Sequence, residues 1–227
     1  MQLGEMMKKS LILAAMLLFT MVCYANSYAA PLAIEVGDGI VIQDGPGVRG
    51  YIPNLGYGGA FEASSPYSKW DNFLTFCLEA DETIAYNQIF YVDGITIEAQ
   101  KGGVNTDSGD PLEPFTAWIY NQAISGAYGS SLLDDVQNAI WYTEQEILSL
   151  NASAKAFYDD QYAAFLSSGW IGLGNVRVLN LVDAFGNFRQ DVLASVSTSP
   201  EPSAAFLLGL GLLVVAAFER KRIIKNK

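Results

Sequence analysis

Residues 115–125 are FTAWIYNQAIS, and here the spacing of apolar residues changes from the pattern of strands to that of a helix. Phe115, Trp118, Ile119 and Ala123 follow one another at helical intervals, so they are expected on one face of a helix. We therefore predict that a helical block begins at this segment, in the middle of a chain that otherwise has the pattern of strands.

Two further helices are predicted after this segment, over 132–150 and 152–167. In the first, Asp134 and Asp135 occupy the first turn, where negative charge complements the positive end of the helix dipole. Its apolar residues share one face, which is typical of a helix packed on a core. That face consists of Leu133, Val136, Ala139, Ile140 and Ile147.

Strands are predicted before the helical block. Residues 32–62 are rich in Gly, Val and Ile and contain turn pairs, which is typical of short strands and loops. The stretch 72–79, NFLTFCLE, is predicted to be one strand. The stretch 89–98, IFYVDGITIE, is predicted to be a hairpin that turns at Asp93-Gly94.

Strands are also predicted after the helical block, over 176–182 and 188–196, with a turn through Gly186 and Asn187. Strands, helices and strands in this order indicate an α+β fold. We expect β-sandwich or barrel-like strands with an inserted group of about three helices, framed by one further apolar helix at each end of the chain.

The N-terminal apolar helix is predicted to be a signal peptide. Lys8 and Lys9 precede an uncharged apolar run over 11–23, and small residues follow it. This order is typical of secretion signals, and we expect cleavage after Ala29. The apolar run is shorter than the roughly 20 residues that a membrane-spanning helix needs, which disfavours a permanent anchor. Residues 1–29 are therefore assigned to the signal peptide.

The C-terminal residues, 199–227, contain three features in order. A stiff segment with two prolines comes first, an uncharged stretch over 204–218 follows as a predicted transmembrane helix, and a basic cluster expected in the cytoplasm comes last. The defining residues are Pro200, Glu201, Pro202, Arg220, Lys221 and Arg222. This order resembles the PEP-CTERM sorting signal of exopolysaccharide-producing Gram-negative bacteria.

The resemblance implies a processing partner, exosortase, which is a membrane protease-transpeptidase that recognises and removes this segment. The chain would be exported through the inner membrane and held there by its C-terminal helix. After processing it would lie at the cell surface or in the extracellular matrix. Residues 30–198 are then the extracytoplasmic domain, which at roughly 170 residues is long enough for one real core.

Composition narrows the function of this domain. Residues 30–202 carry 22 of the chain's 24 acidic residues but six of its 13 basic ones, a net charge of −16, which disfavours nucleic acid as a partner. The chain has no histidine, which excludes Ser-His and Cys-His hydrolytic dyads and histidine-ligated metals. Cys23 lies in the signal peptide, so Cys77 is the one thiol of the mature domain. Composition alone leaves open whether that thiol is reactive or simply buried.

Two short motifs stand out, one around Cys77 and one around Gln137, a glutamine on the apolar side of a predicted helix. The first is Phe76-Cys77-Leu78-Glu79, and the second is VQNAIW over 136–141. Together they resemble the thioester domains of Gram-positive surface adhesins, which carry an aromatic-Cys-hydrophobic-acid block and a later T-Q-x-A-[IV]-W block. This chain has valine where the adhesins have the threonine. The stretch 116–121, TAWIYN, is similar to a helix of PEP-CTERM proteins that carry this pair of motifs.

In that family the cysteine sulfur and the glutamine side chain form an internal thioester, which an amine on a partner attacks. The resemblance implies a thioester crosslink between Cys77 and Gln137. The supporting residues it implies are Phe76, Glu79, Ala139, Trp141 and Glu144. In a chain without histidine, Glu79, Glu144 or backbone groups are the candidates to accept the thiol proton. A buried side-chain amide without partners is costly. A glutamine on an apolar helix face must therefore either lose its amide nitrogen in the thioester reaction or form hydrogen bonds with it, for example to the backbone.

We therefore expect an exported, adhesin-like surface or biofilm-matrix protein that couples covalently to an amine or hydroxyl on a partner such as exopolysaccharide. The alternative is a non-covalent structural or carbohydrate-binding matrix protein that retains only the fold, with aromatic rings for sugars. A turnover enzyme is not expected, because no carboxylate pair lies in a catalytic motif. No cofactor or metal is expected, since the acidic runs 79–82 and 107–110 lack a full calcium-loop pattern.

Overall fold

The computed structural model of this chain describes residues 31–46, 50–52, 56–58, 60–80, 82, 84–100 and 109–197. The predicted signal peptide and the predicted sorting signal lie outside these residues. Within them, no helix combines the length and the apolar character that crossing a membrane requires.

The fold is α+β, with a six-stranded antiparallel sheet in the order β10-β9-β6-β1-β4-β5. Two short two-stranded sheets accompany it, β2 with β3 and β7 with β8. The strands of the main sheet are β1 (Gly39–Asp44), β4 (Phe61–Ser64), β5 (Phe73–Thr75), β6 (Ile89–Thr96), β9 (Val176–Val182) and β10 (Phe188–Ser195). The short strands are β2 (Gly50–Ile52), β3 (Gly56–Gly58), β7 (Glu98–Ala99) and β8 (Asp110–Pro111).

The two end strands of the main sheet are linked by the residues that follow β5. The Leu193 N–H donates to the Phe76 carbonyl at 3.2 Å, and the Leu78 N–H donates to the Asp191 carbonyl at 3.1 Å. Between them Cys77 faces Val192 in an antiparallel bridge. The chain after β5 therefore runs beside β10, the strand at the opposite end of the order.

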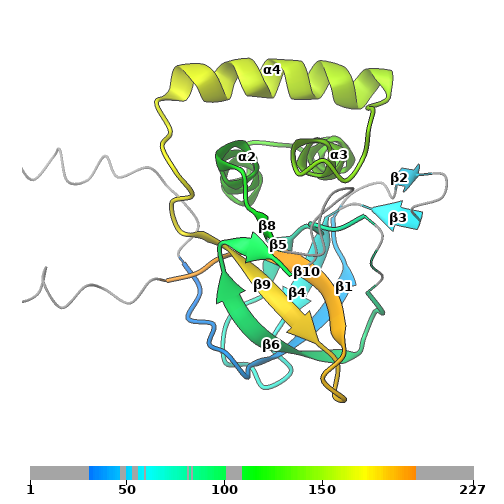
Figure 1. Cartoon of the computed structure of the whole chain (residues 1–227), viewed down its shortest axis with the longest axis vertical. Helices are drawn as coiled ribbons and strands as arrows, with labels where there is room; N and C mark the ends of the chain where they lie inside the picture. The colour runs from blue at the N-terminus through cyan, green and yellow to red at the C-terminus, as the bar shows by residue number, and fades with distance from the viewer. Residues whose placement is uncertain are drawn as a thin grey trace, which may run out of the picture.

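The helices all lie on one side of this strand layer (Figure 1). They are α2 (Pro114–Ile124), α3 (Leu133–Thr143) and α4 (Ala152–Ser168), with a 3-10 turn, η1 (Ser130–Leu132), before α3. Figure 1 shows α4 lying across α2 and α3, which separate it from the strands. Proline opens α2, the Asn151 side chain caps α4 by accepting the Ala154 N–H, and left-handed Gly169 ends α4.

The buried residues form two cores, one on each face of the strands. One core lies between strands and helices and contains Phe76, Phe115, Ile119, Ile140 and Leu193. The other is built mainly from strand residues that point the opposite way, such as Ile40, Ile42, Phe90, Leu181 and Val192. Alternate residues of one strand supply the two cores, as the period of two requires. Cys77 and Trp141 belong to the second core.

The predicted positions of all three helices are confirmed, but the predicted end of the second is wrong. The apolar face from Leu133 to Ile140 is buried as expected. However, α3 ends at Thr143 instead of continuing to 150, because Gln145 adopts a left-handed φ of 62°. The Glu146 N–H then donates to the Trp141 carbonyl, which completes a helix-ending turn. Ile147 lies beyond the helix and packs against the second core.

Two strand predictions are also corrected. Residues 89–98 do not form a hairpin, because β6 runs straight through Asp93-Gly94 as one strand with a bulge. A Cβ atom at Gly94 would lie 2.8 Å from the Asn180 side chain. The glycine therefore allows two strands to approach closely and does not form a turn. The stretch 72–79 is a strand only at Phe73–Thr75 and continues as the irregular pairing with β10. The strands predicted after the helices are confirmed as β9 and β10.

Candidate functional site

Cys77 lies inside the strand layer, shielded from solvent. Its side chain is 3% exposed and belongs to the core that also contains Phe90, Val192 and Trp141. Because Cys77 faces Val192 in the pairing with β10, the neighbouring Phe76 carbonyl and Leu78 N–H bond to that strand. The N–H and carbonyl of Cys77 itself therefore point away from β10, as the alternation of an antiparallel pair requires.

Gln137 satisfies both of these main-chain groups. The Cys77 N–H donates to Gln137 Oε1 at 3.0 Å, and Gln137 Nε2 donates to the Cys77 carbonyl at 2.8 Å. The Gln137 side chain on α3 thus takes the place that a further strand would occupy beside Cys77. Gln137 is 1% exposed, so its carboxamide contacts the cysteine in a site without bulk water. The two residues of the sequence motifs, 60 positions apart, are brought into contact.

The Cys77 thiol is protonated at rest. Burial raises the pKa of Cys77 well above its ordinary value, and the negative charge of Glu79 raises it further. Attack by this sulfur on an acyl carbon therefore requires transfer of its proton to a nearby acceptor.

Trp141 follows Gln137 by one helical turn, so both side chains leave the same face of α3. It is 3% exposed and packs in the core of Cys77. Its indole Nε1 is buried and has no hydrogen-bond partner in the described part of the chain. An unpaired buried donor is costly, and here it lies in the core that holds the thiol.

The other supporting residues of the first motif and of α3 are packed against the helices. The Phe76 ring is fully buried and meets Tyr120 of α2 edge-on, with ring centroids 6.2 Å apart. Ala139 is also fully buried in the helix-side core, where a small residue lets α3 approach its neighbours closely. Both residues therefore position the site and have no polar group to offer it.

Glu79 is held by a bulge in β10. Register shifts between Arg189 and Val192, so Gln190 and Asp191 together oppose one residue of β9. The Asp191 N–H donates to Glu79 Oε2 at 2.9 Å, and Gln190 Nε2 donates to the Glu79 carbonyl. Glu79 is 2% exposed, so these contacts fix a buried carboxylate two residues after Cys77.

Glu144 joins the end of α3 to the start of α2. Its Oε1 accepts the Glu113 N–H at 3.2 Å, and the residue is 5% exposed. Burial raises the pKa of Glu144 to about 8, although the Thr116 hydroxyl and the Glu113 N–H act in the opposite direction, while Asp110 and Glu113 add repulsion. A carboxyl group with this pKa exchanges its proton near neutral pH.

No family model, curated protein or solved structure matches this chain. Function is therefore inferred from the residues of the site alone.

Four described carboxylates lie close to the residue that follows Cys77. Glu79, Asp110, Glu144 and Glu146 line a crevice beside Leu78 that has no room for a water molecule. Within the residues that the structure describes, no group of three or more potential ligands is arranged to hold a metal ion. Of the acidic run 107–110, residues 107 and 108 lie outside the described part of the chain.

Several residues of the site were not anticipated. Gln190 and Asp191 are buried polar residues directly before the apolar run Val192 to Ala194, and this break in the pattern is the sequence signal that could have located them. Burial raises the pKa of Asp191 to about 6, against the lowering effect of hydrogen bonds from Gln100, Asn180 and Leu181. Glu146 accepts the Ala80 N–H at 2.9 Å, a contact that only the turn at Gln145 makes possible. The sorting-signal residues lie outside the described part of the chain.

Proposed function

We propose that this chain is an exported surface or biofilm-matrix protein whose domain forms an internal thioester between Cys77 and Gln137. The observation that supports this is the two-point contact of the Gln137 carboxamide with the Cys77 main chain. The Gln137 carboxamide contacts the backbone of Cys77, and both residues are buried, which is an arrangement that favours an intramolecular acyl transfer.

The reaction is balanced without a co-reactant. Cys77 Sγ attacks Gln137 Cδ, the C–N bond of the carboxamide breaks, and the thiol proton leaves with the amide nitrogen as ammonia. The products are one thioester and one ammonia. An amine of a partner would later attack the same carbon, forming an amide and returning the proton to Cys77 Sγ.

The surrounding residues have distinct proposed roles. Because the thiol is protonated at rest, Glu79 or the ionised form of Glu144 would accept its proton. With a pKa of about 8, Glu144 is mainly protonated near neutral pH, so only its minor ionised form could act as the acceptor. The unpaired Trp141 Nε1 would donate to the carbonyl oxygen as charge develops on it. The bond reacts once per molecule, so no catalytic turnover is proposed.

Export and sorting complete the proposal. Residues 1–29 would direct secretion, and 199–227 would hold the chain in the inner membrane until exosortase removes them. We further propose that the strands form a barrel-like closed sheet, supported by the hydrogen bonds between the residues after β5 and β10. Such closure would exclude water from Cys77 until a partner arrives.

The test is the intact mass of the purified mature protein. We expect it to fall short of the sequence mass by one ammonia, because the thioester has lost the amide nitrogen. Methylamine should then add its full mass and make Cys77 reactive toward a thiol reagent. The Cys77→Ala and Gln137→Glu variants are the controls, since neither can release ammonia between these residues. An unreacted thiol together with the full sequence mass would refute the thioester.

A second candidate function is favoured by the same contact. The Gln137 carboxamide already has a partner for each of its polar atoms, so an intact glutamine is stable in this position. The domain would then be a non-covalent structural or carbohydrate-binding matrix protein. Glycan binding that is unchanged in Cys77→Ala would favour this candidate.

A further inference from the structure

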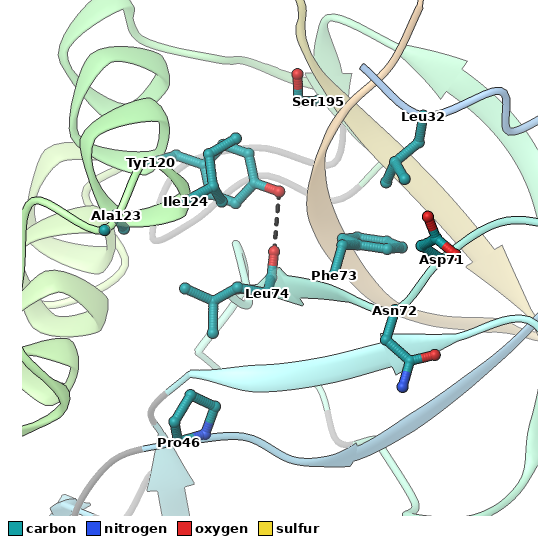
Figure 2. Close-up of a pocket in the computed structure, with 11 residues that line it drawn as sticks. Leu32, Pro46, Asp71, Asn72, Phe73, Leu74, Tyr120, Ala123, Ile124 and Ser195 are labelled. Atoms are coloured by element: carbon teal, nitrogen blue, oxygen red, sulfur yellow. Dashed lines mark hydrogen bonds between the residues drawn. The ribbon is translucent and has the colours of Figure 1, made fainter. Parts of the chain in front are cut away.

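A second site lies away from the cysteine, between the start of β5 and the end of α2. It is a half-open cavity of about 420 Å³, a size typical of small-molecule sites. Figure 2 shows α2 on one side and the strands on the other. Its lining includes Leu32, Asp71, Phe73, Tyr120 and Ser195, and does not include Cys77 or Gln137.

The inner surface of this cavity is apolar and fixed. The Phe73 ring is held by an edge contact with Trp70, with centroids 5.4 Å apart. Across from it, Tyr120 donates its hydroxyl to the Leu74 carbonyl at 2.9 Å, which orients the tyrosine along the wall (Figure 2). Leu32 and Ile124 extend the apolar surface. A ligand would therefore need an apolar face to lie against these rings and side chains.

Polar groups surround this apolar surface. Ser195 is 6% exposed, lines the cavity and has no hydroxyl partner within the described residues. Asn72 donates its amide nitrogen to Glu62 at 2.7 Å, which leaves its carbonyl oxygen to accept from a ligand. The Asp71 carboxylate is exposed at the same wall, and no described residue hydrogen-bonds to it. The cavity thus offers mainly acceptors, one buried hydroxyl and a negative charge.

We propose that this cavity binds one or two glycosyl units of a neutral or amino sugar. A sugar ring has apolar C–H faces for Phe73 and hydroxyl groups around its edge for Asp71, Asn72 and Ser195. The carboxylate and the acidic chain disfavour phosphate, uronate or nucleic acid. This proposal rests on the second candidate function, a non-covalent carbohydrate-binding protein, and names the site where the carbohydrate would bind. It does not depend on the thioester.

The test is saturation-transfer NMR and calorimetry on the purified full chain. The probes are glucose, galactose, N-acetylglucosamine, glucosamine, maltose and cellobiose, with glucuronate as the anionic comparison. We expect saturable binding of at least one neutral or amino sugar, and weaker binding of glucuronate. Asp71→Ala should weaken binding at least tenfold, and because Asp71 is exposed this variant should fold.

Matched variants show whether the sugars bind in this cavity or elsewhere on the protein. Phe73→Ala should also weaken binding at least tenfold, whereas Tyr67→Ala, which removes an aromatic ring that is 71% exposed elsewhere, should not change it. Cys77→Ala should bind normally, so the outcome is independent of the intact-mass experiment. The site is refuted if no sugar of the panel binds saturably, or if binding is the same in Asp71→Ala and Phe73→Ala as in the natural chain.

Discussion

Gln137 shows how one side chain can complete a sheet. Cys77 has a strand on one side only, and its own N–H and carbonyl would be buried without partners on the other. The Gln137 carboxamide has one acceptor and one donor at the spacing of a peptide group, so it pairs with both. This contact explains why a polar residue occupies an apolar helix face in the chain with an intact glutamine.

The first prediction concerns the loss of this contact. Gln137→Leu should lower the free energy of unfolding by roughly 2–5 kcal/mol, because two buried main-chain groups of Cys77 lose their partners. Urea denaturation in the Cys77→Ala background measures this without any crosslink. Asn138→Ala is the control, since within the described residues that side chain hydrogen-bonds to the Asp134 carbonyl of its own helix turn alone, and a change within about 1 kcal/mol is expected. Equal effects of the two variants would contradict the role of Gln137.

At the scale of elements, α3 is the helix that assembles the site. Gln137, Trp141 and Glu144 leave it at intervals of four and three, so they lie along one side. The early end of α3 is as important as its start. The left-handed turn at Gln145 reverses the chain and lets Glu146 reach the Ala80 N–H, three residues after Cys77. A helix that continued to 150 would direct Glu146 elsewhere.

The second prediction concerns the end of α4. Gly169 adopts a φ of 71° with open space around it, so Gly169→Ala introduces no clash but places a side chain in a left-handed conformation. We expect destabilisation of about 1 kcal/mol, measured by urea denaturation. The matched control is Gly129→Ala, since Gly129 has an ordinary φ of −69° and equally open space. The control should leave stability unchanged or raise it by up to about 1 kcal/mol, since alanine adopts this φ without strain. A neutral Gly169→Ala would show that this turn is not strained.

At the scale of the whole molecule, the first and last described segments lie side by side. The Leu32 N–H donates to the Ser195 carbonyl, and the Ser197 N–H donates to the Leu32 carbonyl, both at 2.8 Å. Leu32 and Ser195 both line the proposed sugar cavity. The cavity therefore lies where the first and the last described segments of the chain meet.

The third prediction is a pH dependence of the whole fold. The pKa of Glu144 is raised from 4.5 to about 8 by burial, and that of Asp191 to about 6. Between pH 4.5 and 8 the folded protein keeps the Glu144 proton while the unfolded chain has released it. Stability should therefore fall as pH rises through this window, by up to a few kcal/mol for Glu144. Glu144→Gln, which keeps the acceptor for Glu113 N–H, should remove this part of the decrease.

The measurement is urea denaturation at pH 5, 7 and 9 for the natural chain and the variant. Asp93→Asn, at an exposed position of β6, is the control and should retain the pH dependence of the natural chain. A Glu144→Gln variant with the same pH dependence as the natural chain would show that Glu144 is ionised in the folded state.

The sequence by itself determined the fold class and most of the helices. The change from strand to helix spacing at 115–125 is a local property, because helical periodicity and capping depend on residues within a few positions. The motifs around Cys77 and Gln137 were also visible, together with the absence of histidine and the acidic charge. The same local patterns located β9 and β10.

Only the tertiary structure decided how these pieces form a site. The hairpin prediction at Asp93-Gly94 failed because the glycine makes room for Asn180 of a neighbouring strand, 86 positions away, and does not form a local turn. The bulge at Gln190 and Asp191 brings two hydrogen-bond donors to Glu79, through contacts that are distant in sequence. The turn at Gln145 brings the Glu146 carboxylate to the Ala80 N–H, which is also distant in sequence. The raised pKa values of Cys77 and Glu144 follow from burial, which arises only when strands and helices have packed.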